Sequence, residues 1–164
     1  MKPFYVFLDI DGVMNDFEYW NKCKQKHGNG RVMSLQNYPF NPDSLNNLML
    51  LKQELQHKQY AMRIVLSSTW RLDGESTAIV NSRLAEYGMQ IYDKTSNTIS
   101  RLNSLRAFEI KEWLKVHKSP INYIILDDAD VSDEFEEKHY VKTNPNVGFN
   151  KDKLKEAIEK VCTK

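Results

Sequence analysis

Two aspartates, Asp9 and Asp11, stand one residue apart at the end of the apolar run 4–8, and Gly12 follows them directly. A carboxylate that is buried without a partner is costly, so it either loses its charge or pairs with a positive group. Carboxylates at the end of a buried strand therefore indicate a bound cation or a basic partner. Gly12 lets the backbone turn sharply beside them, where a ligand must approach closely.

Two further apolar runs end in polar side chains. The run 62–66 is followed by three hydroxyl residues and the run 123–126 by two aspartates; these residues are Ser67, Ser68, Thr69, Asp127 and Asp128. Short, continuously apolar runs are typical of parallel strands that are covered on both faces. Because the carboxyl ends of parallel strands open onto one edge of the sheet, we expect these side chains to meet there. Carboxylates and a hydroxyl form a hard-oxygen site, which suits Mg²⁺ better than zinc or copper.

A site of this kind favours phosphoryl chemistry. Two like charges about 4 Å apart repel by roughly 4 kcal/mol at an effective dielectric near 20. Mg²⁺ and a basic side chain must therefore offset the repulsion between an aspartate and a phosphate dianion. One aspartate can then attack phosphorus and form an aspartyl-phosphate, while the other protonates the leaving oxygen and later activates water.

Helical patterns separate the apolar runs. Asn41 and Pro42 mark the start of a helix with leucines on one face, and Ser76 is a candidate cap for a second helix that stops at Gly88. Two more helices are expected over 105–116 and 150–161, and weaker strands over 89–92 and 140–143. Strands that alternate with helices predict an α/β protein with a three-layer, Rossmann-like, doubly wound parallel sheet.

Residues 16–40 interrupt this alternation. The segment is polar and rich in aromatic residues, and it contains Gly28, Asn29 and Gly30. It is either a short hairpin flap, or minimal cap insertion, with the Gly-Asn-Gly stretch as its turn, or a surface loop. No insertion is long enough to form a large cap domain, so we expect a single domain over 1–164 with an open site.

Composition limits the remaining function classes. The 23 basic and 22 acidic residues give a formal charge of +1, so the overall field offers no reason to bind a polyanion. Two cysteines, Cys23 and Cys162, make neither a disulfide framework nor a zinc site. The chain shows neither a signal-peptide pattern nor an apolar stretch of membrane-spanning length. We expect a soluble, cytoplasmic protein with no membrane association and no evident stable protein partner.

The motifs resemble those of a known superfamily. Asp9-Ile10-Asp11-Gly12-Val13 is similar to the first motif of the haloacid dehalogenase (HAD) phosphohydrolases, Ser67 to the second, and Leu126-Asp127-Asp128 to the fourth. More narrowly, LSSTWR (66–71), RAFEIKEWL (106–114) and LDD resemble the small HAD domains of Swiss Army Knife RNA repair proteins.

This resemblance implies roles for individual residues. Asp9 is the expected nucleophile and a metal ligand, and Asp11 is the general acid and base, with its backbone carbonyl on the metal. Ser67 holds a phosphoryl oxygen. Asp127 and Asp128 complete the Mg²⁺ site.

The third motif of the superfamily is one basic residue, for which Arg106 and Lys111 both qualify. We expect Arg106, because it lies nearer the start of its helix and so nearer the sheet edge. Lys111 is then assigned to substrate binding, together with Gly12, Ser68, Thr69 and Arg71.

Each motif alone has a simpler explanation as a turn, a helix cap or a solvated charge; the ordered combination favours a site. Trp70 and Arg71 could stack on a base and grip a second phosphate, or pack a helix end. The same alternatives hold for Tyr19, Trp20 and Arg31.

The sequence therefore predicts a Mg²⁺-dependent phosphatase that hydrolyses phosphomonoesters through an aspartyl-phosphate. Its phosphorylated substrate is a nucleotide, a nucleic-acid end or a phosphoprotein. The alternatives are a phosphate-binding or regulatory HAD module without turnover, and a HAD phosphotransferase.

Overall fold

Five parallel strands form the centre of the molecule. The computed structural model describes residues 1–27, 38–96, 105–117 and 122–162. In these ranges the strand order is β3-β2-β1-β4-β5, with β1 in the middle. The strands are β1 (Lys2–Leu8), β2 (Tyr60–Leu66), β3 (Ile91–Lys94), β4 (Asn122–Asp127) and β5 (Tyr140–Lys142). The predicted α/β, Rossmann-like parallel sheet is confirmed.

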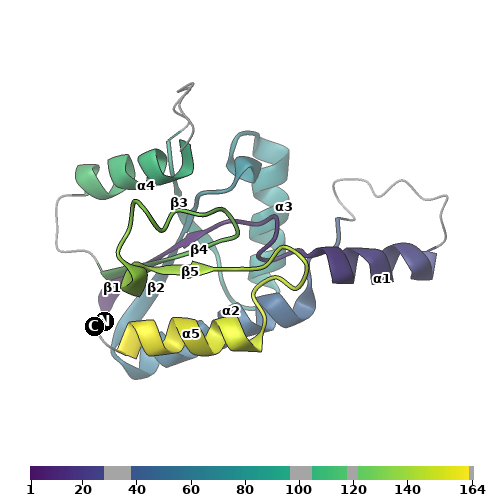
Figure 1. The fold of residues 1–164 in the computed structure, drawn as a ribbon, viewed down its shortest axis with the longest axis horizontal. Coiled ribbons are helices and arrows are strands. Elements are labelled where there is room, and N and C mark those ends of the chain that lie inside the picture. The colour runs from purple at the N-terminus through teal and green to yellow at the C-terminus, as the bar shows by residue number, and fades with distance from the viewer. Residues whose placement is uncertain (28–37, 97–104, 118–121, 163–164) are drawn as a thin grey trace.

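Helices cover both faces of the sheet. In Figure 1, α4 (Leu105–Val116) lies above the sheet, and α2 (Pro42–His57) and α5 (Lys151–Cys162) lie below it. α3 (Gly74–Ala85) contributes to the same hydrophobic cluster as α2 and α5. Short 3₁₀ helices follow β2 and precede β5: η2 (Thr69–Arg71) and η3 (Glu137–His139). No helix among the described residues is long and apolar enough to cross a membrane.

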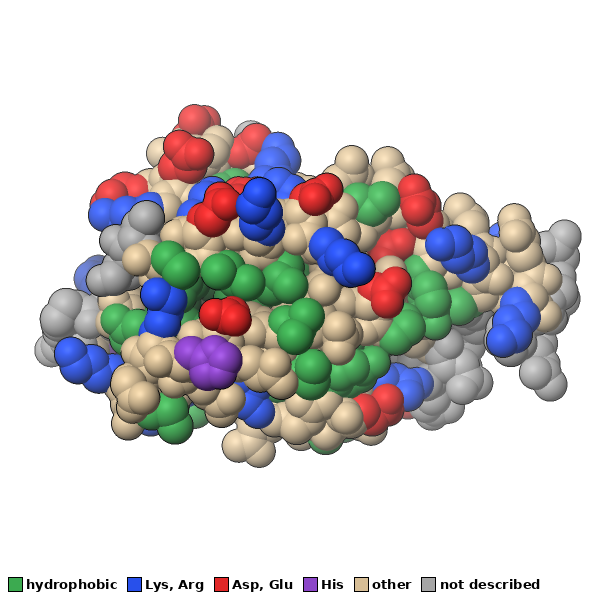
Figure 2. All heavy atoms as spheres, turned by 90° about the horizontal axis from the view of Figure 1, so that it is seen from below, with side chains coloured by type: hydrophobic (Ala, Val, Ile, Leu, Met, Phe, Trp, Pro, Cys, Tyr) green, Lys and Arg blue, Asp and Glu red, His purple; other side chains and the backbone are tan. Residues whose placement is uncertain are grey.

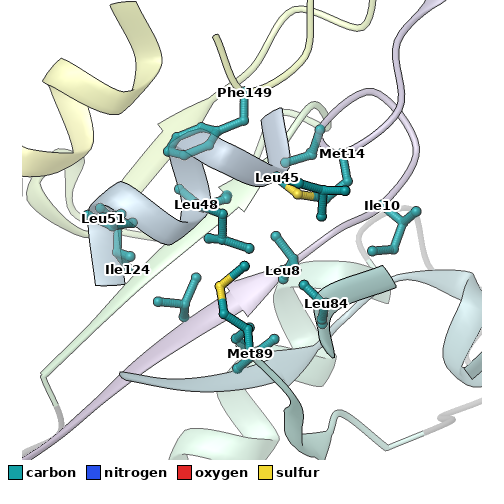
Figure 3. Packing of buried hydrophobic residues seen from close by; sticks show 14 of the residues in the cluster. Leu8, Ile10, Met14, Leu45, Leu48, Leu51, Leu84, Met89, Ile124 and Phe149 are labelled. Atoms are coloured by element: carbon teal, nitrogen blue, oxygen red, sulfur yellow. The ribbon is translucent and has the colours of Figure 1, made fainter. Parts of the chain in front are cut away.

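The continuous apolar runs are explained by burial on both faces. Leu8 and Ile124 pack with Leu48, Leu51 and Phe149 in the cluster between the sheet and α2, as Figure 3 shows. On the other face, β1 residues alternate into a second cluster with α4. There the Phe7 and Trp113 rings meet edge to face, with centroids 5.2 Å apart. Strands that are covered on both sides need apolar residues at every position.

The molecular surface carries mixed charge. On the face seen from below, acidic and basic side chains are interspersed, and no large patch of one sign is visible (Figure 2). This agrees with the near-zero formal charge of the sequence.

Residues 17–27 differ from the expectation of a hairpin flap or a loop. They form the helix α1 (Phe17–His27), which projects beyond the end of the sheet in Figure 1. Asp16 caps this helix, because its Oδ1 accepts a hydrogen bond of 2.8 Å from the Tyr19 N–H. The Gly-Asn-Gly stretch at 28–30 and Arg31 lie outside the described residues.

The cap of α3 also differs from the expectation. Asp73, and not Ser76, is the N-cap residue, and its Oδ1 accepts a 2.8 Å hydrogen bond from the Ser76 N–H. Ser76 therefore lies inside the first turn of the helix.

The turn before α5 fixes the base of α1. The Phe17 and Glu18 N–H groups donate to the carbonyl oxygens of Pro145 and Asn146 at 3.0 and 3.1 Å. Gly148 closes this turn with φ +61°, and a Cβ there would lie 2.8 Å from the Val13 carbonyl oxygen. The position thus requires both a left-handed backbone and the absence of a side chain.

Arg71 joins the loop after β2 to the residues after β3 and to α4. Its side chain is buried, and its Nη2 lies 2.6 Å from a carboxylate oxygen of Glu109, which is also buried. The same guanidinium donates to four backbone carbonyl oxygens, those of Ser67, Ser68, Thr95 and Ser96. These five contacts occupy the five N–H donors of the guanidinium. The prediction that Arg71 binds substrate is therefore wrong, because no donor is left for a phosphate.

We expect Gly148→Ala to lower the free energy of unfolding by about 2–4 kcal/mol, from the left-handed backbone and the clash with Val13. Chemical denaturation measures this change. The matched control is Gly74→Ala at the start of α3, where a Cβ has nothing within 4 Å. That variant should be unchanged or up to about 1 kcal/mol more stable, and an equal loss in both would contradict the role of Gly148.

Glu109→Ala should lower the free energy of unfolding by about 3–5 kcal/mol, because it leaves the Arg71 guanidinium buried without a countercharge. Glu112→Ala in the same helix removes the exposed pair with Lys115, whose side chain is 78% exposed, and should cost less than about 1 kcal/mol. Both variants place alanine in α4, so denaturant midpoints report the difference in pairing. Similar small losses for the two would show that Arg71 does not depend on Glu109.

Candidate active site

Strand register places Asp9 between the two neighbouring strand ends. Leu8 of β1 pairs with Leu66 of β2 and with Leu126 of β4. The Asp9 N–H donates to the Leu126 carbonyl, and the Ser67 N–H donates to the Leu8 carbonyl, both at 3.0 Å. Asp9 and Ser67, which directly follow β1 and β2, and Asp127, the last residue of β4, therefore lie on neighbouring strands at the carboxyl edge of the sheet, as the sequence predicts.

Three carboxylates meet at this edge. Asp9, Asp127 and Asp128 each present an oxygen, and these oxygens lie within 4.8 Å of one another. Asp9 and Asp127 are buried and Asp128 is half-buried. Burial raises the pKa of Asp127 to about 7 and Asp9 adds to the rise, while Arg106 opposes it. Burial and the Asp9 charge also raise the pKa of Asp128.

The donor set fits a hard divalent cation. Carboxylate oxygens are the ligands that Mg²⁺ takes in proteins, and a bound cation stabilises the ionised form that burial disfavours. The absence of a side chain at Gly12 leaves room for the Asp128 carboxylate, because a Cβ there would lie 2.5 Å from Asp128 Oδ2. Gly12 has φ +72°, and its carbonyl accepts a 2.8 Å hydrogen bond from the Thr143 hydroxyl.

Arg106 supplies the basic group of the site. Its Nη1 lies 3.2 Å from Asp9 Oδ2 and is also hydrogen-bonded to Asp127. Burial alone would lower the pKa of Arg106, but the charges of Asp127 and Asp9 outweigh burial and raise it. The guanidinium therefore remains positively charged beside the two carboxylates.

Lys111 lies elsewhere. Its ammonium pairs with Glu134 and lies 5.6 Å from the centre of the Phe135 ring. Five residues along a helix amount to about 7.5 Å of rise, so Lys111 is carried away from the end where Arg106 meets the sheet edge. Of the two basic candidates the structure brings only Arg106 to the carboxylates, and the assignment of Lys111 to substrate binding stays a prediction.

Asp11 is held apart from the acidic cluster. Its Oδ1 accepts a 2.9 Å hydrogen bond from Asn15 Nδ2, and its Oδ2 accepts one of 3.0 Å from Trp70 Nε1. The side chain lies at the surface. An exposed carboxylate fixed by two neutral donors, outside the cluster, is suited to proton transfer. Ligation of a metal by the Asp11 carbonyl stays a prediction.

Trp70 does not present its ring to a ligand. The ring is 8% exposed and packs edge to face against Tyr38 and Phe40, with centroids 5.2 and 5.6 Å away. Of the two alternatives for Trp70, the structure contradicts base stacking and supports local packing. The indole N–H of Trp70 donates to the Asp11 carboxylate.

The hydroxyls after β2 differ in their partners. Ser67 Oγ is fully buried and has no hydrogen-bond partner among the described residues, which is a costly state for a polar atom. Ser68 is the N-cap of η2, and its Oγ accepts from the Trp70 N–H at 3.5 Å. Thr69 is exposed at the start of η2. Of these three residues, Ser67 thus has the buried hydroxyl with unused hydrogen-bonding capacity; Thr95, which follows β3 at the same edge, has another.

Sequence reasoning missed the residues that orient Asp11 and Gly12. Asn15 also accepts a hydrogen bond from the Gly12 N–H at 3.1 Å, so it ties the loop to the Asp11 carboxylate. Its position four residues after Asp11 was the available signal. Thr143 follows β5, and nothing in the sequence linked it to a glycine 131 residues earlier.

The comparisons with known proteins agree with this geometry. No match was found among curated proteins or among solved structures. One family model matches residues 5–154, which is most of the chain; it describes the HAD domain in Swiss Army Knife RNA repair proteins. HAD membership supports a role of the phosphohydrolase type. The chain belongs to the family of HAD domains found in Swiss Army Knife RNA repair proteins.

Proposed function

We propose that the protein is a Mg²⁺-dependent phosphatase in which Asp9 is the nucleophile. The observation that carries this proposal is the meeting of the Asp9, Asp127 and Asp128 carboxylates beside Arg106, with the Asp11 carboxylate held separately. A binding site alone does not need a second aspartate that is exposed and oriented for proton transfer.

Asp9, Asp127 and Asp128 would hold the cation. When bound, Mg²⁺ neutralises negative charge on the phosphoryl oxygens and on the attacking carboxylate. Ser67 Oγ, which lacks a partner among the described residues, would donate to a phosphoryl oxygen. Arg106 keeps a positive charge next to Asp9 and so favours approach of the phosphate dianion.

The reaction divides between the two aspartates of the first motif. An Asp9 oxygen forms a bond to phosphorus as the bond from phosphorus to the leaving oxygen breaks, and Asp11 gives its proton to that oxygen. Asp11, now ionised, takes a proton from water as the water attacks the aspartyl-phosphate. Asp9 and inorganic phosphate are regenerated, and Asp11 is protonated again.

The family favours one substrate class among the three expected from the sequence. The matched domains belong to RNA repair proteins, so a terminal phosphate on a nucleic acid is favoured over a phosphoprotein. The site opens beside Asp11, at the exposed end of the sheet, which leaves room for a large substrate. Cytoplasmic location and action without a stable partner protein stay predictions.

Asp9→Asn should lower kcat/KM for a generic aryl phosphate by about 10⁴-fold or more in the presence of Mg²⁺, because an amide cannot replace the nucleophile. The measurement is steady-state release of phosphate, with circular dichroism to confirm folding. Asp133→Asn, an exposed aspartate in the loop after β4, is the matched control and should retain wild-type activity. Full activity in Asp9→Asn would remove Asp9 from the mechanism. A wild-type protein that binds Mg²⁺ yet turns over no phosphoester would indicate a non-catalytic HAD module.

Mg²⁺ should raise the melting temperature of the wild-type protein, since a ligand at 100 times its Kd stabilises the folded state by about 2.7 kcal/mol. Asp128→Asn should lose most of this increment while the metal-free protein is no less stable, because the variant removes one of three mutually repelling carboxylates. Thermal denaturation with Mg²⁺ and with EDTA measures both effects. An undiminished Mg²⁺ increment in Asp128→Asn would place the cation elsewhere.

A further inference from the structure

Two pockets flank the Asp11 carboxylate. The first, which we call the α1 pocket, has a volume of about 400 Å³ and is lined by Asp11, Gly12, Asn15, Asp16, Phe17, Trp20, Tyr38 and Pro145. The second, the η2 pocket, has a volume of about 360 Å³ and is lined by Asp11, Tyr38, Thr69, Trp70, Asp73 and Ser76. Asp11 and Tyr38 stand between them.

We propose that the α1 pocket binds the leaving group of the reaction and that this group is the terminal nucleoside of an RNA strand, with its base against Trp20. The inference rests on the proposed function, because it takes Asp11 as the acid that protonates the leaving oxygen. A group transferring a proton must lie within hydrogen-bond reach of the atom that receives it. The leaving group therefore lies next to Asp11, in one of the two pockets that share this residue.

The available aromatic surface favours the α1 pocket. Phe17 is 59% exposed, and Trp20, one turn further along α1, is half-buried. In the η2 pocket the corresponding ring, Trp70, is 8% exposed and its N–H is bonded to Asp11. Base stacking needs a free aromatic face. Tyr38 lines both pockets, so among the described residues the rings that distinguish the α1 pocket are those of Phe17 and Trp20.

The wall of the α1 pocket is held in place before any ligand binds. The first turn of α1 is hydrogen-bonded to the backbone carbonyls of Pro145 and Asn146, and the backbone N–H of Trp20 donates to the backbone carbonyl of Asp16 at 2.9 Å. Asp16 is itself buried. Its Oδ1 accepts a hydrogen bond from the backbone N–H of Tyr19, and its Oδ2 accepts one from Asn41 Nδ2. A fixed wall lowers the entropy that a ligand loses on binding.

Charge selects the part of a nucleotide that fits. The charged residues that line the α1 pocket in the described structure are Asp11 and Asp16, so a second phosphate would be repelled there. An uncharged ring meets no such penalty. Further along α1, Lys24 is exposed and lies one turn from Trp20 on the same face of the helix, with its ammonium 4.7 Å from the centre of the Trp20 ring. This lysine is placed to receive the next phosphate of a strand whose terminal base lies in the pocket.

The test compares two short single-stranded RNAs that differ only in the terminal phosphorylated nucleotide, which is intact in one and abasic in the other. Each is made with a 3′ and with a 5′ terminal phosphate. We expect the wild-type kcat/KM to be roughly 10- to 100-fold higher with the base present, for one of the two phosphate positions. Trp20→Ala should bring this ratio close to one, and Trp20→Phe should restore most of it. Tyr92→Ala, which removes a ring that is 50% exposed on β3, is the matched control and should keep the wild-type ratio.

A binding measurement separates this inference from the proposed function. Asp9→Asn protein is titrated with the same RNAs by calorimetry, with and without Trp20→Ala. A base-dependent affinity that Trp20→Ala removes would support the pocket assignment even if the wild-type protein hydrolysed neither RNA. The inference is overturned if neither the hydrolysis assay with the wild-type protein nor the binding assay with Asp9→Asn shows a preference for the base. It is also overturned if Trp20→Ala leaves the preference intact or weakens both RNAs equally.

Discussion

The mutual repulsion of the carboxylates of Asp9, Asp127 and Asp128 is the constraint around which the site is arranged. Two of these groups are buried, where water cannot screen them, and such a cluster is stable only beside positive charge. Arg106 contacts Asp9 and Asp127 directly, and burial still leaves the pKa of Asp127 near 7. The protein's own charges thus neutralise the cluster incompletely. A divalent cation would complete this balance, and the bound cation together with Arg106 would then attract a phosphate that the bare carboxylates repel.

The remainder of the fold holds these groups in register. Asp9 is fixed from both sides by strand pairing, since β1 lies in the centre of the sheet. The loop after β2 has no strand to hold it, and Arg71 takes over this task through the carbonyl oxygens of Ser67 and Ser68 and the carboxylate of Glu109. Glu109 and Arg106 are both in α4. One helix therefore secures the loop that carries Ser67, through Glu109, and places the positive guanidinium of Arg106 beside Asp9. Stability and the geometry of the site therefore depend on the same packing of α4 against the sheet.

Much of this arrangement could be predicted because it depends on local sequence. The apolar runs before Asp9, Ser67 and Asp127 indicated buried parallel strands, and Asn41 with Pro42 marked the start of α2, which the structure confirms. The wrong prediction for Arg71 concerns a side chain with two possible partners. Arg71 was expected at a phosphate because an exposed arginine would serve there, whereas its burial against Glu109 depends on a residue 38 positions away. For Trp70 the sequence left base stacking and packing as alternatives, since its partners Tyr38 and Phe40 come from a distant segment.

The helix α1 has a different physical basis from the sheet edge. The groups around Asp9 come from strand ends and α4 and are buried or half-buried. Among the described residues, α1 is anchored by the backbone hydrogen bonds of its first turn, and its Phe17 is exposed and its Trp20 half-buried. A phosphate has one shape in every substrate, so a rigid, buried site can recognise it. Leaving groups vary, and a helix attached at one end can change its exposed residues without disturbing the core. Asp11 belongs to both parts: its backbone follows β1, and its carboxylate borders the pocket beneath α1. In the proposed mechanism, proton transfer at Asp11 is therefore the step at which the common phosphoryl chemistry meets the specific leaving group.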